Sequence, residues 1–264
     1  FCRYLEQHFE RLDFIVNNAC QTIRRPPEFY RHMLEKESTF TNQIPENLRG
    51  LLKEYQQLRE VGIPPSKTGL FKNPDKNLVD LTDVARLSQQ ALTGEDFDVG
   101  EHLFPSGQLD QDLQQIDLIS RNSCRLLMDD VSSVELMEVQ LINAIAPYVI
   151  NARLKSMLVR GKERDRHIIN VSAVEGQFYR RFKTTRHPHT NMAKAALNMM
   201  TRTSAADYHS DGIHMNSVDT GWVTDEDPAE IAERKTAEHQ FHPPLDVVDG
   251  AARSVDPIMN GLNS

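Results

Sequence analysis

The stretch LDFIVNNAC, from Leu12 to Cys20, decides how the rest of the chain is interpreted. Its apolar residues 14–16 stand in an unbroken run, which is typical of a short strand buried on both faces of a parallel sheet. Before this run, residues 1–11 carry apolar side chains at helical spacing with charged residues between them. The pattern predicts an amphipathic helix that leads into a strand.

The same alternation returns after residue 133. Residues 134–158 repeat apolar side chains on a broad helical face, as a long buried helix requires. They are followed by RHIINVSA at 166–173, a strand pattern, and by a helix over 189–208 that is rich in Ala, Met and Leu. Residues 212–224 then form a strand that runs into a loop. This order predicts an α/β fold with a parallel sheet and helices on both faces.

Residues 25–133 differ from the rest of the chain. They contain two Pro-Pro pairs, Gln-rich stretches and acidic loops, which favour short helices joined by irregular segments. We expect helices near 46–61 and 81–91. A stretch of this length exceeds ordinary loops, so it predicts an insertion that serves as a lid or a partner surface.

Composition excludes several classes of function. The net charge of −8 and the pI near 5.7 come without a Lys/Arg block, so we expect neither nucleic acid nor an anionic membrane as a partner. Three widely separated cysteines predict no disulfide and no zinc site, and an intracellular reducing compartment such as the cytosol or an organelle matrix. The histidines lack a metal-binding spacing, and no apolar stretch is long enough for a membrane span.

Five motifs in one order resemble the short-chain dehydrogenase/reductase family. They are NNA at 17–19, LINA around Asn143, INVSAVEG at 169–176, the helix with Lys194, and MNSVDTGWVT at 215–224. The resemblance implies a partial Rossmann-like, doubly wound parallel sheet formed by residues 1–24 and 134–264, with a mostly helical and irregular insertion at 25–133. It also implies an oxidoreductase that uses NAD or NADP, although a fold alone does not prove a function.

Catalysis in that family uses a Tyr, a Lys, a Ser and an Asn. The resemblance assigns Asn143 and Lys194 to two of these positions, while Thr190 replaces the Tyr and Ala173 replaces the Ser. A Thr hydroxyl is shorter than a phenol and a much weaker acid. His189 could donate a proton instead, but on a helix it points about 100° away from the position of Thr190.

The resemblance also assigns the residues that would contact the cofactor. At its nicotinamide end these are Asn17, Asn18, Ala19, Lys194, Gly221, Trp222, Val223 and Thr224. The Gly-rich turn that grips the pyrophosphate in this fold should precede Asn17, and it does not appear in the sequence. We therefore expect a domain whose N-terminal cofactor-binding unit is missing from this sequence.

Three hypotheses for the function follow. The first is a degenerate, non-catalytic member that acts as a binding or structural subunit. The second is an NAD(P)H-dependent oxidoreductase whose N-terminal segment lies outside this sequence, and the third is a split domain completed by another chain. For partners we expect a homodimer through the helices that carry Asn143 and Lys194, or a larger complex through the insertion. Met192, Met199 and Met200 are interpreted as core residues, with a dimer contact as the alternative.

Overall fold

The computed structural model describes residues 1–34, 88–97, 100–109, 115–160, 165–240 and 242–263. The contacts divide the chain into two compact units. One holds Arg25–Asp117 with Phe1, and the other holds Cys2–Arg24 and Leu118–Ser264. The predicted division at 1–24, 25–133 and 134–264 stays a prediction.

The larger unit is built on a parallel sheet of three strands in the order β1, β2, β3. These strands are β1 (Phe14–Asn17), β2 (Arg166–Ser172) and β3 (Ile213–Asp219). All residues of β2 are buried, as a central strand covered on both faces requires. In the register Ile15 pairs with Ile168, and Ile168 pairs with Met215. The predicted parallel α/β arrangement is confirmed.

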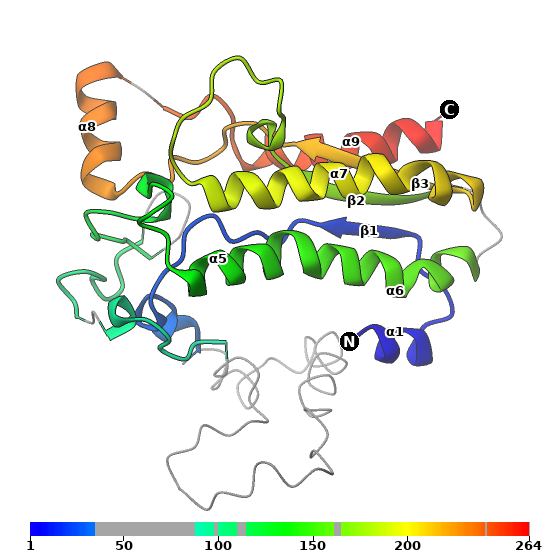
Figure 1. Cartoon of the computed structure of the whole chain (residues 1–264), viewed down its shortest axis with the longest axis horizontal. Coiled ribbons are helices and arrows are strands. Elements are labelled where there is room, and N and C mark those ends of the chain that lie inside the picture. Colours follow the sequence, from blue (N-terminus) through cyan, green and yellow to red (C-terminus); the bar gives the residue numbers. More distant parts are fainter. Residues whose placement is uncertain (35–87, 98–99, 110–114, 161–164, 241, 264) are drawn as a thin grey trace, which may run out of the picture. The chain divides into compact units, whose positions relative to one another are not determined.

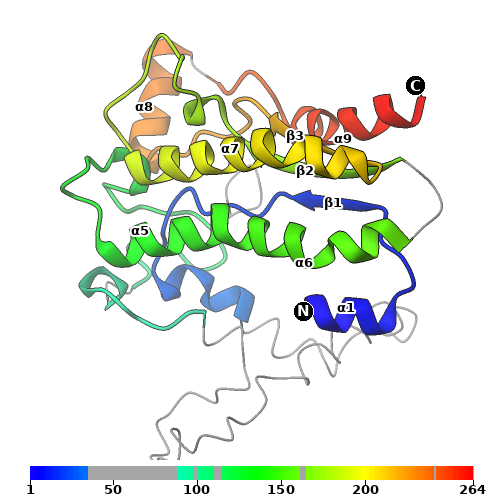
Figure 2. The same cartoon turned by 45° about the vertical axis from the view of Figure 1, so that its right-hand side comes forward.

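Helices cover both faces of this sheet, with α6 (Ala146–Arg160) and α7 (Pro188–Ser210) on one face and α9 (Val247–Asn263) on the other. The described part of the larger unit also contains α1 (Cys2–His8), which packs on α6, and α5 (Ser133–Gln140) and α8 (Ala229–His239). Figures 1 and 2 show α6 and α7 side by side along the strands. Their core includes Leu154, Leu158, Ile168 and Ile213. On the other face, Ile258 of α9 packs against β2.

The predicted helix over 134–158 is observed with an irregularity. A π-helical turn, Leu141–Ile145, joins α5 to α6. Such a turn holds one extra residue within the helix, and the apolar pattern does not reveal it. At the start of α5, the Ser132 side chain accepts a hydrogen bond from the Glu135 amide at 3.1 Å, which caps the helix.

Among its described residues, the smaller unit contains two short 3-10 helices, Pro27–Tyr30 and Gly94–Phe97. Phe29 is buried with its ring edge-on to that of Phe104, and the Arg25 guanidinium lies over the Phe29 ring at 4.2 Å. The predicted helix at 46–61 lies outside the described residues. Of the predicted helix at 81–91, only residues 88–91 are described, and they are not helical.

Two of the three methionines interpreted as core residues lie on the surface. Met192 and Met199 of α7 are 55% and 54% exposed, so the core interpretation is wrong for both. They occupy the face of α7 that turns away from the sheet, whereas Leu197 on the opposite face is buried. Within the described ranges, no helix combines the length and the apolar character needed to cross a bilayer.

Candidate functional site

A cleft of about 760 Å³ lies at the carboxyl ends of β2 and β3. In open α/β sheets this edge is where ligands bind. Asp219, at the end of β3, organises the rim. Its carboxylate accepts hydrogen bonds from the Val174 amide at 3.0 Å and from the Gly221 amide at 2.9 Å, which joins the turns after the two strands.

The turn after β2 presents a methyl group where a hydroxyl was expected from the family pattern. Ala173 has an extended backbone and lines the cleft. The neighbouring Ser172 donates from Oγ to the Lys194 carbonyl at 3.3 Å. Gly176 then lets the turn approach α7, because a Cβ there would lie 2.6 Å from the Lys194 carbonyl carbon. The carboxyl end of β2 is therefore held tightly against the helix.

Lys194 is buried between β2 and α7. Its Nζ donates a hydrogen bond to the Val171 carbonyl at 2.9 Å, and only 7% of the residue is exposed. The acceptor is a main-chain oxygen of the central strand and not a carboxylate.

Thr190 and His189 begin α7, and both are buried. The Thr190 Oγ1 has no hydrogen-bond partner among the described residues. His189 is 1% exposed, and its Nε2 lies 3.1 Å from the Glu135 Oε1 on α5. The imidazole thus joins α7 to α5, and neither residue lines the cleft.

The Glu135 carboxylate is held in its charged form. Burial acts to raise its pKa, but hydrogen bonds from His189 and Ser123, together with the charges of His189 and Arg24, outweigh burial and lower the pKa. The pair of Glu135 and His189 therefore fixes the start of α7.

Asn143 lies in the π-helical turn and is 1% exposed. Its Oδ1 accepts from the Gln21 amide at 2.7 Å, and its Nδ2 donates to the Gln21 carbonyl at 2.9 Å. Both polar groups of the side chain are used to hold the loop that follows β1. Asn143 is thus a positioning residue in this structure.

Asn17 belongs to a buried network of polar side chains between the strands and helices α6 and α7. Its Nδ2 donates to the Asn151 Oδ1 at 2.9 Å and to the Asn170 Oδ1 at 2.8 Å. The Asn170 Nδ2 donates in turn to the Thr201 Oγ1 at 2.9 Å. The network links β1, α6, β2 and α7. Asn18 and Ala19, next along the chain, are exposed.

The loop after β3 supplies the part of the predicted cofactor site that does line the cleft. Gly221 has a positive φ of 79°, a conformation that glycine adopts readily. Trp222 is 47% exposed, and its Nε1 donates to the Thr224 carbonyl at 2.8 Å. Residues 221–224 all line the cleft. The described residues fit the nicotinamide end of NAD or NADP only in part, because Lys194 and Asn17 use their polar atoms within the protein.

The cleft residues that sequence reasoning missed include Arg125, Arg186 and His187. His187 has a positive φ of 42°, and its Nδ1 is buried without a partner among the described residues. Burial is the main cause that lowers its pKa, and the charge of His189 adds to it. In the sequence, only the two histidines of RHPHT could have indicated an imidazole at the cleft. The sequence does not show which of them faces it.

An ion-pair cluster closes the side of the cleft near α8. Asp227 pairs with Arg125 and, at 2.8 Å, with Lys235. Lys235 also lies 2.5 Å from the Asp225 carboxylate, and its Nζ is 5.7 Å from the centre of the Trp222 ring. Within the described part of the chain, no group of three or more His, Cys, Asp or Glu residues could hold a metal ion.

One protein-family model matches the sequence of this chain. Residues 108–246, more than half of the chain, match the family model described as enoyl-(acyl carrier protein) reductase. An uncharacterized protein of Acanthamoeba polyphaga mimivirus, R665, is 37% identical over 100 residues, which are 36% of this chain and 21% of that protein. The chain therefore spans about a fifth of the length of this relative.

Solved structures are similar to this chain over part of its length. The carbonyl reductase Sniffer of Drosophila melanogaster is 20% identical with a TM-score of 0.40, and the match covers 49% of this chain and 53% of that one. The NADPH-bound carbonyl reductase from chicken fatty liver is 26% identical with a TM-score of 0.33, and the match covers 40% and 43% of the two chains. The family assignment rests on the family model.

Proposed function

Because this chain belongs to the short-chain dehydrogenase/reductase family, we propose that it is a non-catalytic member that uses the family's cleft for binding. One observation carries the proposal. Of the four family positions, Ala173 alone lines the cleft, and it offers a methyl group, while the Thr190 hydroxyl is buried at the start of α7.

The chemistry of these two positions supports this proposal. Carbonyl reduction needs an acid at the substrate oxygen, and a positioned acid contributes about 10²–10⁴-fold to the rate. Thr190, at the position of the family's acid, is buried outside the cleft, and its hydroxyl is a far weaker acid than a phenol. The methyl group of Ala173 offers no hydrogen bond to a substrate oxygen. The remaining two side chains are engaged within the protein, since Lys194 bonds to Val171 and Asn143 bonds to Gln21.

The first test is a titration with NADH and NADPH, followed by the fluorescence of Trp222, the single Trp of the chain. The same samples are assayed for oxidation of either cofactor with a panel of aldehydes and ketones. We expect no turnover, whether or not the fluorescence is quenched. Turnover that disappears in Lys194→Ala and persists in a control, Lys155→Ala, would refute the proposal.

His187 supports a second candidate, an NAD(P)H-dependent oxidoreductase. Its imidazole lines the cleft. Burial is the main cause that lowers its pKa, so the protonated imidazolium that could donate to a substrate is favoured only in acid. Under this candidate, protonated His187 donates a proton to the substrate oxygen, residues 221–224 contact the nicotinamide end, and turnover rises as the pH falls. The two candidates differ in the turnover assay, because only the second predicts an activity that depends on pH and disappears in His187→Asn.

We also propose that the chain forms a homodimer through α5, α6 and α7. Large apolar side chains are exposed on these helices, among them Leu141 at 56%, Tyr148 at 61%, Met192 at 55% and Met199 at 54%. Isolated apolar side chains are common on surfaces, but a contiguous apolar patch favours an interface. Sedimentation velocity should show a dimer that dissociates in Met192→Glu. A larger complex through the insertion at 25–133, and a reducing compartment, remain proposals from the sequence.

A further inference from the structure

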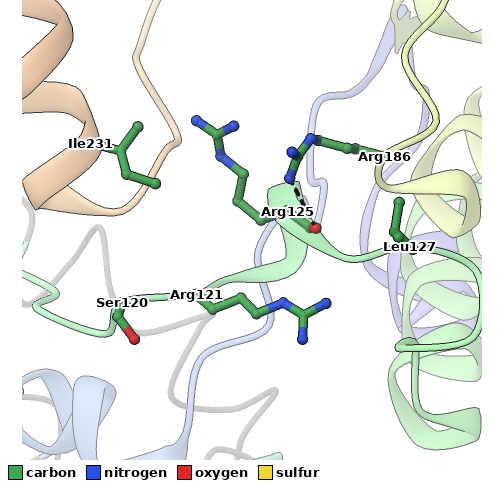
Figure 3. Close-up of a pocket in the computed structure, with 6 residues that line it drawn as sticks. All are labelled: Ser120, Arg121, Arg125, Leu127, Arg186 and Ile231. Carbon is green, nitrogen blue, oxygen red and sulfur yellow. Dashed lines mark hydrogen bonds between the residues drawn. The ribbon is translucent and has the colours of Figure 1, made fainter.

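A second cavity, of about 380 Å³, lies beside the cleft, and three of its six lining residues are arginines. Figure 3 shows its residues, which come from the segment before α5, the loop before α7 and the first turn of α8. They are Ser120, Arg121, Arg125, Leu127, Arg186 and Ile231. Arg125 and Arg186 also line the cleft, so the two cavities share a wall.

The positive charge of this cavity is not fully neutralised within the described part of the chain. Arg121 pairs with Asp130, and Arg125 pairs with Asp227. Arg186 Nη1 instead donates to the Arg125 carbonyl at 3.3 Å, a neutral acceptor, and no described carboxylate pairs with it. Arg186 is exposed, so its guanidinium charge is open to an anion from solution.

Arg125, which lines the cavity, also has a hydrogen-bond donor without an acceptor among the described residues. The Arg125 Nε is buried and has no partner among the described residues. A buried N–H group normally has a partner, because leaving it unpaired costs the hydrogen bond that it made with water. Guanidinium groups also present their N–H donors in a planar fork that matches carboxylate and phosphate oxygens.

Two apolar side chains complete the cavity. Figure 3 shows Leu127 and Ile231 on opposite sides of the view, with the guanidinium groups between them. An inorganic ion would contact only the arginines. A ligand that also carries an apolar group could contact either aliphatic side chain.

We propose that this cavity binds an oxyanion, either a phosphate monoester or a carboxylate, that is carried on an apolar group. The inference does not depend on whether the neighbouring cleft is catalytic, since it rests on different residues and on binding alone.

Isothermal titration calorimetry of the full chain tests this directly. The probes are phenyl phosphate and benzoate, which place two oxyanions on the same apolar ring, with inorganic phosphate and the neutral benzyl alcohol as comparisons. We expect at least one aromatic anion to bind more tightly than inorganic phosphate, and benzyl alcohol not to bind. The stronger of the two anions identifies the ligand class. Absence of binding by both at millimolar concentration would overturn the proposal.

Matched variants locate the site. Arg186→Gln should weaken binding by about tenfold or more, because it removes the guanidinium that lacks a carboxylate partner. Arg181→Gln makes the same charge change in the same loop, but Arg181 lies outside the cavity and stacks on Phe182. It should bind like the wild type.

A second variant, Ser120→Asp, places a carboxylate in the cavity wall. Ser120 is exposed and lies in a different segment from Arg186, and this variant should abolish binding. Equal affinities of Arg186→Gln and Arg181→Gln, or unchanged binding by Ser120→Asp, would refute the assignment.

Discussion

Replacing Glu135 with alanine should destabilise the larger unit by about 3 kcal/mol, since a charge-assisted hydrogen bond contributes about 1.5–3 kcal/mol and an unsatisfied buried group costs about 1–3 kcal/mol. The pair concerned is deeply buried, with side-chain exposures of 7% for Glu135 and 1% for His189. The Nδ1 of His189 has no partner among the described residues, so the alanine variant would leave neither ring nitrogen bonded.

The assay is urea unfolding followed by the fluorescence of Trp222, which lies in the same unit as Glu135. Glu135→Gln retains an oxygen acceptor and should lose less stability than Glu135→Ala. As a matched control, Glu233→Ala removes an exposed carboxylate from α8 and should change the free energy of unfolding by less than about 0.5 kcal/mol.

The pH dependence provides a second check. The folded pKa of Glu135 lies below its unfolded value. Its carboxylate therefore contributes stability that is fully present above the unfolded pKa of about 4.3 and is lost as the pH falls through the folded pKa. The difference between wild type and Glu135→Ala should shrink as the medium is acidified below about pH 4. A difference under about 0.5 kcal/mol at neutral pH would refute the reasoning.

Three further predictions concern stability. Asn170→Ala removes three buried side-chain hydrogen bonds and should cost about 3 kcal/mol in urea unfolding, whereas the partly exposed Asn198→Ala should cost less than about 1 kcal/mol. Gly176→Ala would force a Cβ against the α7 backbone and should cost about 1–3 kcal/mol by calorimetry. Gly94→Ala, with no atom within 4 Å of its Cβ, should be nearly neutral. Burial, followed by the charge of His214, lowers the pKa of His167, so stability should fall as the pH drops below the unfolded pKa of about 6.5. His167→Gln should flatten that part of the profile, and an unchanged profile would contradict the assignment.

Local sequence patterns were sufficient for the three strands and for the helices before β3, whereas α8 and α9 were not predicted. In β1, in the strand RHIINVSA and in the helix that carries Lys194, the spacing of apolar residues fits only one kind of secondary structure. The π-helical turn could not be predicted, because its extra residue does not interrupt the apolar face. The surface position of Met192 was also missed, since helical periodicity alone does not say which face meets the sheet.

The site was predictable only in part, because its geometry depends on contacts between distant segments. Residues 221–224 and Ala173 were identified through the family pattern and do line the cleft. His187 was not, since its position is fixed by its amide, which donates to the Leu126 carbonyl at 2.9 Å. Likewise, nothing near Asn143 in the sequence indicates that its side chain would bind Gln21, 122 residues away.

The π-helical turn at Leu141–Ile145 makes the chain sensitive to a change in length at one point. Deleting a single residue there would let an uninterrupted α-helix run through, but it would turn α5 by about 100° relative to α6. Glu135 would then face away from His189, and Asn143 would no longer meet the loop after β1. Insertions and deletions are usually tolerated in loops and rejected in helices. In this helix, the extra residue keeps Glu135 of α5 facing His189 and Asn143 facing the loop after β1.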